Sequence, residues 1–142
     1  MTPGSPPSGL ARFAALPAGE RRLRLEAWWR LLGADLALRL GRRAPLERAL
    51  ADPGAGETAG AEIVARAVAS AAAHHLWPIT CLPRALVVWR MLAARGIPSR
   101  VRIGVRREEG SIRAHAWVEA GGRPLAEPER VDERFLPLIE AE

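Results

Sequence analysis

The chain has 142 residues, of which 49% are hydrophobic and 26% are charged, a balance typical of one folded domain that excludes an intrinsically disordered chain. The net charge of +5 comes from arginines scattered along the sequence, so neither nucleic acid nor a membrane surface is predicted as a partner. One cysteine excludes an internal disulfide, and neither a signal peptide nor a bilayer-spanning apolar stretch is recognisable, which predicts a cytoplasmic protein.

The first half of the chain reads as an arm followed by two helices. Residues 1–19 are rich in Pro, Gly, Ser and Ala, which predicts a flexible arm, and a single domain is expected over residues 20–142. Residues 20–40 predict an amphipathic helix, whose core-facing stripe consists of Leu25, Trp28, Trp29, Leu32, Leu36 and Leu40. Residues 41–57 read as a turn, and residues 57–77 predict an Ala-rich helix that packs closely against its neighbours.

The second half changes from helical to strand periodicity. A third, buried helix is predicted to begin at about Cys81 and to end where Gly96 suits a left-handed cap and Pro98 prevents continuation. Alternating residues and two tight turns then predict a meander of three strands, over residues 100–107, 111–120 and 123–127. Helices followed by a small antiparallel sheet predict an α+β fold.

Cys81 opens a predicted helix, a position that suits a nucleophile. The positive end of the helix dipole and the unpaired N–H groups there favour a thiolate. Pro78 and Pro83 support this boundary, because proline is tolerated before a helix and in its first turn. The alternative is a small apolar residue that fills the core, since free cysteine is among the most commonly buried residues.

His115, on the central predicted strand, is the candidate base for a thiol protease or acyltransferase, which needs an imidazole near the sulfur. A third group must orient that imidazole, and Glu127 would lie beside His115 if the strands pair in register around the turn at 121–122. The alternative is that Glu127 is only a surface carboxylate. The rival acids are Glu119, Glu129 and Asp132.

Strand alternation leaves the environment of His115 open, because it turns His115 and Trp117 away from the apolar face of the strand. Either the strand is covered on both faces, with Trp117 buried beside His115 against the cysteine helix, or His115 faces solvent without a chemical role.

The remaining aromatic and histidine residues divide between substrate binding and packing. Trp77, four residues before Cys81, and Trp117 are the candidate substrate-binding residues. The other tryptophans at helical spacing are predicted to be core residues, namely Trp28, Trp29 and Trp89. His74 and His75 are adjacent and face different directions, and without a metal-ligand spacing neither a metal nor a cofactor is predicted.

Residues 81–125 resemble a known family. The pieces that carry the resemblance are "CLPRAL" at the helix start, "GIP" before the first strand, "IGV" within it, and "AHAWVE" followed by "GRPL". Together they are similar to the leader peptidases of lasso-peptide biosynthesis, within the transglutaminase-like cysteine protease superfamily. The close match covers about a third of the chain.

The resemblance implies a papain- or transglutaminase-like core with a catalytic triad of Cys81, His115 and Glu127, although members of the family usually have Asp at the acid position. It implies hydrolysis of a ribosomally made precursor peptide between leader and core, before a separate ATP-using cyclase closes a macrolactam. Fused members carry an extra leader-binding domain, for which this length leaves no room. A stand-alone protease half is therefore expected, with a separate leader-recognition protein that contacts the N-terminal arm or the helix of Trp28 and Trp29.

Two other functions stay open. A transglutaminase-like acyltransferase would use the same residues but join an amine where the peptidase uses water. A non-catalytic interaction module would keep Cys81 buried and unreactive.

Overall fold

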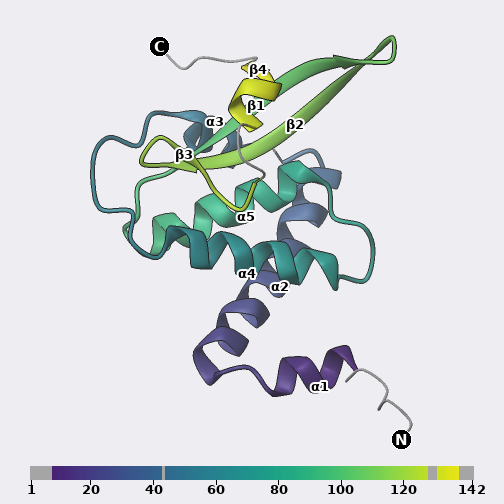
Figure 1. Cartoon of the computed structure of the whole chain (residues 1–142), viewed down its shortest axis with the longest axis vertical. Coiled ribbons are helices and arrows are strands. Elements are labelled where there is room, and N and C mark those ends of the chain that lie inside the picture. The colour runs from purple at the N-terminus through teal and green to yellow at the C-terminus, as the bar shows by residue number, and fades with distance from the viewer. Residues whose placement is uncertain (1–7, 43, 128–130, 138–142) are drawn as a thin grey trace, which may run out of the picture.

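The computed structural model describes residues 8–42, 44–127 and 131–137, which form a group of helices beneath a small antiparallel sheet (Figure 1). The helices are α1 (Gly9–Ala14), α2 (Ala18–Arg39), α3 (Ala44–Leu50), α4 (Ala61–Ala73), α5 (Cys81–Ala94) and α6 (Val131–Arg134). The strands are β1 (Arg100–Glu108), β2 (Ser111–Ala120), β3 (Arg123–Pro124) and β4 (Leu136–Pro137). The α+β fold predicted from the sequence is confirmed.

The core lies around α5, which is placed between the sheet and the long helices α2 and α4 (Figure 1). Its fully buried side chains come from both layers and include Leu31, Val68, Val87, Met91, Leu92 and Val101. Helix α4 contributes mainly small buried residues, namely Ala61, Val64, Ala65, Ala67, Val68 and Ala71. The close packing predicted for this Ala-rich segment is confirmed, because these small side chains let α4 approach both α2 and α5.

Local signals place the ends of α5 and the turn between β1 and β2 where the sequence predicts them. Gly96 has a φ of +70°, and the Ile97 N–H donates to the Leu92 carbonyl at 2.9 Å, which closes α5 with a glycine-dependent cap. Glu109 and Gly110 both have positive φ values, of 49° and 82°, as a two-residue hairpin turn requires. The strands order as β3-β2-β1-β4, and Gly104 in β1 lies opposite His115 in β2.

The buried side of α2 differs from the predicted stripe. Its buried residues are Ala27, Leu31 and Asp35. The exposed residues include four members of the predicted stripe, namely Leu25, Trp29, Leu36 and Leu40. Asp35 lies inward because its Oδ2 accepts a hydrogen bond from Trp77 Nε1 at 2.7 Å. The prediction was wrong because leucine and tryptophan occur on several sides of α2, so the apolar pattern alone does not single out one face. Trp28 and Trp89, by contrast, pack against the core.

Short elements were also missed. Helix α1 lies within the segment predicted to be a flexible arm, and α3 lies within the segment predicted to be a turn. Helix α6 and strand β4, which pairs with β1 at Gly104 and Val105, follow the three predicted strands. Strand β3 has only two of the five residues predicted for it. Elements this short carry too little periodicity to be recognised before their packing partners are known.

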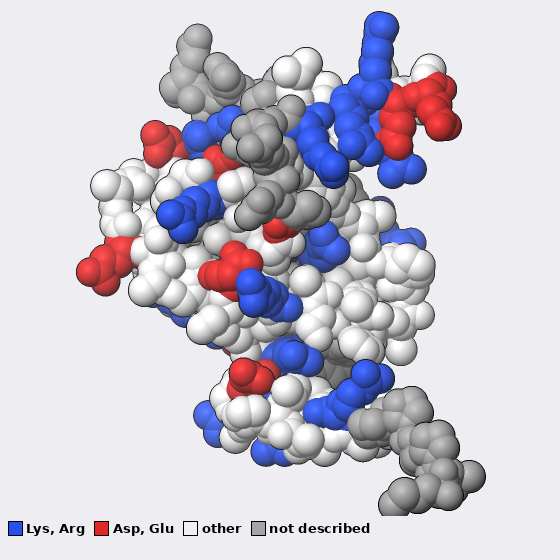
Figure 2. Space-filling model, in the orientation of Figure 1, with Lys and Arg blue, Asp and Glu red and all other residues white. Residues whose placement is uncertain are grey.

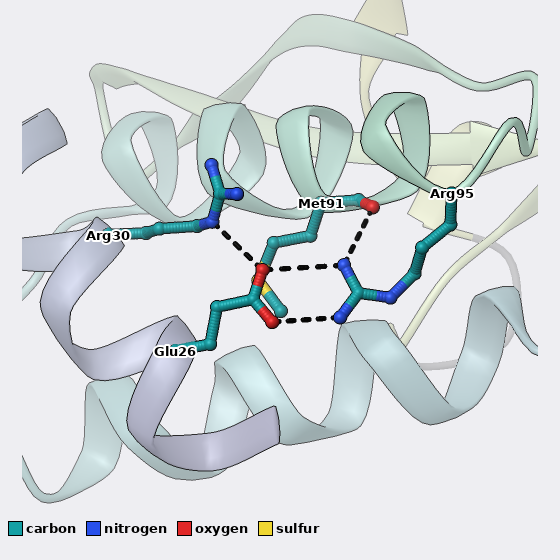
Figure 3. Close-up of polar contacts among 4 residues, drawn as sticks. All are labelled: Glu26, Arg30, Met91 and Arg95. Carbon is teal, nitrogen blue, oxygen red and sulfur yellow. Dashed lines mark hydrogen bonds and ion pairs between the residues drawn. The ribbon is translucent and has the colours of Figure 1, made fainter. Parts of the chain in front are cut away.

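An ion-pair network fixes α5 to α2 at the end of α5 that is remote from Cys81 (Figure 3). Glu26 of α2 accepts hydrogen bonds from Arg95 Nη2 at 2.8 Å and from Arg30 Nε at 3.0 Å. Arg95 Nη1 also donates to the Met91 carbonyl at 3.0 Å, which satisfies a carbonyl at the end of the helix. The hydrogen bond from Arg95 lowers the pKa of Glu26 below its ordinary value of 4.5, against the opposing effect of partial burial.

The charged surface is mixed in sign. Figure 2 shows arginine side chains spread over the β1–β2 hairpin and the helices, with acidic side chains among them. Several of these charges are paired, such as Arg113 with Glu108 at 3.2 Å. No single basic stripe is seen on this face. Across the described residues, no helix combines the length and apolarity needed to cross a membrane.

Candidate active site

Cys81 is the first residue of α5 and is only partly buried. It packs against the hydrophobic core, but its side chain keeps access to the surface. The preceding Thr80 makes no side-chain capping hydrogen bond to the helix, so the N–H groups of the first turn are free of that partner. Cys81 therefore lies at the start of a helix with access to the surface, while it also packs against the core.

His115 and Glu127 form the central contact of the site, with 3.0 Å between His115 Nε2 and Glu127 Oε1. The side chains are 21% and 9% exposed, so the bond is well shielded from water. The ladder between β2 and β3 ends at Pro124, with one further bond from the Leu125 N–H, so Glu127 reaches His115 through the left-handed Ala126 and not through strand pairing in the predicted register. When the Nε2–H group donates a hydrogen bond to the carboxylate, Nδ1 of the neutral ring carries no proton. Nδ1 can then take a proton from a thiol.

The strand that carries His115 is covered on both faces. Ala116 and Val118 face the core beneath the sheet, while Trp117, on the other face, is only 2% exposed. His115 stacks with Trp117 at 5.9 Å between ring centroids and contacts the ring of Phe135 at 5.3 Å. The cover on this face thus includes Phe135, from the segment after α6, a residue that the sequence did not point to.

A small cavity joins Cys81 to the acid. Cys81, Arg84 and Glu127 line it together with residues of α4, α5 and β2, and its volume of about 20 Å³ is enough for a single water. Arg84 Nη2 lies 4.0 Å from Glu127 Oε1, so a cation stands near the carboxylate. Among the described residues no hydrogen bond joins the Cys81 thiol to the His115 ring. Such a contact often tightens only when substrate binds.

The rival acids are engaged elsewhere or lie outside the described residues. Glu119 accepts a hydrogen bond from Trp117 Nε1 at 3.3 Å and lies 3.9 Å from Arg100 Nη2. Glu129 and the side chain of Asp132 are outside the described part of the chain. Glu127 is therefore the acid that the structure brings to His115.

The two candidate substrate-binding tryptophans have different environments. Trp77 lines a surface groove of about 460 Å³, whose wall also includes Arg84 from the cavity beside Cys81. Its indole N–H is held by Asp35, so the ring has a fixed orientation there. Trp117 is interior and packs on His115, so its burial argues against direct contact between its indole and a peptide.

Comparison with known proteins places this arrangement in a family. A family described as "Transglutaminase-like superfamily" matches residues 21–140. The chain belongs to the transglutaminase-like superfamily. Members of this superfamily are generally enzymes that depend on a cysteine, with protease or acyltransferase activity. No curated protein and no solved structure gives a significant match.

Sequence reasoning missed two residues of this transglutaminase-like site. Arg84 lies one helical turn after Cys81, so its i+3 spacing was a signal that it shares a face with the cysteine. Phe135 gave no such signal, because its contact with His115 depends on the return of the chain after α6. Within the described ranges, no three His, Cys, Asp or Glu side chains are grouped so that they could hold a metal ion.

Proposed function

We propose that this protein is a cysteine peptidase that removes the leader from a ribosomally made lasso-peptide precursor in the cytoplasm. The observation that carries the proposal is the shielded 3.0 Å contact between His115 and Glu127, next to a cavity that Glu127 shares with Cys81. Membership of the transglutaminase-like superfamily supports cysteine chemistry. The similarity of residues 81–125 to lasso leader peptidases supports the choice of substrate.

In the acylation step, His115 Nδ1 takes the proton of the Cys81 thiol, and the thiolate attacks the carbonyl carbon at the end of the leader. Glu127 accepts a hydrogen bond from His115 Nε2–H and stabilises the imidazolium that forms. Backbone N–H groups in the first turn of α5 donate to the developing oxyanion. His115 then gives its proton to the amine of the core peptide, the C–N bond breaks, and a thioester of Cys81 with the leader remains.

In the deacylation step, His115 takes a proton from a water molecule, which attacks the thioester carbonyl. The C–S bond breaks, the thiolate regains its proton from His115, and the leader leaves as a free acid. The released core amine is then available to the separate cyclase. The groove that contains Trp77 suits the leader, because it meets the Cys81 cavity at Arg84.

The proposed partner is a separate leader-recognition protein, for which the structure offers an apolar groove between α1, α2 and α4. This groove has a large apolar lining, namely Leu10, Phe13, Leu16, Leu25, Trp28 and Trp29. Trp29 is 64% exposed and Leu10 is 79% exposed. The charged side chains that line it are cationic, Arg12 and Arg24. This combination suits an acidic amphipathic segment of the partner.

The experiment is incubation of the protein with a lasso precursor peptide, with and without the leader-recognition protein, read by mass spectrometry. Cleavage at the leader-core junction should disappear in Cys81→Ala and fall by roughly 10²-fold or more in Glu127→Gln. Glu119→Gln is the matched control and should keep full activity. Retained cleavage in Cys81→Ala would overturn the proposal.

Analysis of the product and alkylation of Cys81 separate the other candidate functions. An amide adduct in place of a free leader acid would indicate the acyltransferase. No cleavage, together with a Cys81 that resists iodoacetamide at neutral pH, would indicate the non-catalytic module.

The partner surface has its own test. Trp29→Ala should abolish stimulation by the leader-recognition protein while leaving the basal rate unchanged. Ile112→Ala, which removes an equally exposed apolar side chain on the β1–β2 hairpin, is the control and should keep the stimulation.

A further inference from the structure

Glu62, in the first turn of α4, makes a contact that the proposed mechanism does not use. Its Oε1 and Oε2 both accept the backbone N–H of Ala126, at 3.1 and 3.2 Å. Ala126 directly precedes Glu127, whose Oε1 lies 3.0 Å from His115 Nε2. Helix α4 carries none of the three triad residues. It is nevertheless connected to the imidazole, because Glu62 binds Ala126 and the next residue, Glu127, contacts His115.

The backbone at Ala126 requires such support. Its φ is +50°, in the left-handed region that residues with a side chain rarely adopt. Strand β3 ends at Pro124, and the Leu125 N–H makes the last bond to β2, to the Val118 carbonyl at 2.9 Å. Beyond that bond, the carboxylate of Glu62 supplies the backbone anchor for the residue before the triad acid.

The segment that leads into α4 also packs against the opposite end of β3. A Cβ placed on Gly121 would lie 3.3 Å from Thr58 Oγ1, which shows how closely the β2–β3 turn approaches this segment. Thr58 thus lies close to the turn before the short strand β3, and Glu62 bonds to the backbone after it. Arg66 is ion-paired with Glu62 at 3.3 Å but is 75% exposed, so the Ala126 contact is the more shielded of the two.

We infer that Glu62 is a positioning residue for the triad acid, which holds the left-handed turn at Ala126 so that the Glu127 carboxylate stays on His115 Nε2. This inference rests on the proposed function for its effect on catalysis. The geometry that it describes is measurable without any substrate.

The test compares Glu62→Ala with Glu62→Gln, whose amide oxygen still accepts the Ala126 N–H. Arg66→Ala is the matched control, because it removes the other partner of Glu62 and leaves the Ala126 contact in place. Two quantities are measured in each variant. The first is the NMR signal of the His115 ring N–H, identified by its absence in His115→Ala, and the second is kcat and KM for precursor cleavage.

The Glu62→Ala variant should lower kcat by about 10- to 100-fold with KM unchanged, because a small displacement of a catalytic group costs this much. It should also lose the His115 ring N–H signal to exchange with water. Glu62→Gln and Arg66→Ala should retain both the signal and kcat. This rescue by glutamine is a result that a general loss of stability would not give.

A Glu62→Ala variant with an unchanged ring signal and unchanged kcat would overturn the inference. Equal losses in Glu62→Gln and Glu62→Ala would overturn it too, because the acceptor for Ala126 would then be irrelevant. If the parent protein cleaves no precursor, the proposed function fails, and the ring signal in the same variants still decides whether Glu62 positions Glu127.

Discussion

Gly104 has no side chain, and the space beside it is filled by Phe135 and Trp117, the two aromatic residues that cover His115. The Gly104→Ala variant tests this arrangement. A Cβ at position 104 would lie 2.6 Å from Phe135 Cβ and 2.9 Å from Trp117 Cη2. Phe135 Cβ is bonded directly to the backbone and cannot rotate away, so the segment that contains Phe135 must move. Because the rings of Phe135 and Trp117 both contact the His115 ring, the methyl group disturbs the environment of the imidazole.

The expected destabilisation follows from two opposing effects. Overpacking of a filled site costs about 2–3 kcal/mol of unfolding free energy. Replacing glycine by alanine restricts the unfolded chain and returns about 0.7 kcal/mol. The net loss is therefore about 1.3–2.3 kcal/mol, and with a urea m-value of about 2 kcal/mol/M the unfolding midpoint should fall by about 0.7–1.2 M.

Urea unfolding, followed by far-UV circular dichroism, measures this shift. Gly33→Ala is the matched control, because Gly33 lies inside α2 and an added Cβ there meets nothing within 4 Å. That variant should gain about 1 kcal/mol from helix propensity. An unchanged midpoint for Gly104→Ala, or a loss of similar size in Gly33→Ala, would refute the reasoning.

Three further predictions concern the helices. Glu26→Gln should lower the unfolding free energy by up to about 1 kcal/mol at neutral pH, since the pair is partly exposed. Because folding lowers the pKa of Glu26, this contribution is present above the unfolded pKa and is lost as the pH falls through the folded pKa. Urea unfolding at about pH 7 and about pH 3 should show the difference from the parent disappear, and a constant difference would contradict it. Trp77→Phe removes one of the two side-chain donors to the buried Asp35 carboxylate, the other being Arg39, and should cost about 1 kcal/mol in thermal unfolding, so an unchanged Tm would rule out this contact. Leu31→Ala should cost about 2–5 kcal/mol, whereas Leu40→Ala should change stability by less than about 0.5 kcal/mol, and equal effects in denaturant unfolding would contradict the orientation of α2.

The parts of the fold that were predicted correctly depend on short-range patterns. The start of α5 at Cys81, its end at Gly96 and the β1–β2 turn at Glu109 and Gly110 follow from the conformations that single residues allow. The turn at 121–122 pairs β2 with β3 only as far as Pro124, and the left-handed Ala126 then brings Glu127 to His115. The sequence therefore indicated that Glu127 lies near His115, but not the backbone geometry that makes the contact.

The orientation of α2 was not accessible in this way. Its sequence offers leucine or tryptophan on several sides, and the buried side carries Asp35, whose Oδ2 accepts hydrogen bonds from Trp77, 42 positions away, and from Arg39. The exposed Trp29 that results is the basis for the proposed partner surface. These two donors satisfy the buried carboxylate, which would be costly if it were left unpaired.

By itself, the sequence determined the order of helices and strands around the site, the helix-start position of Cys81 and the strand position of His115, because dihedral preferences and residue periodicity are local properties. Only the tertiary structure decided which side of α2 is buried, that Phe135 covers His115, and that Glu62 holds the turn before Glu127. Those contacts join segments that are far apart in the chain, and their geometry depends on how the layers pack rather than on the residues nearby in sequence.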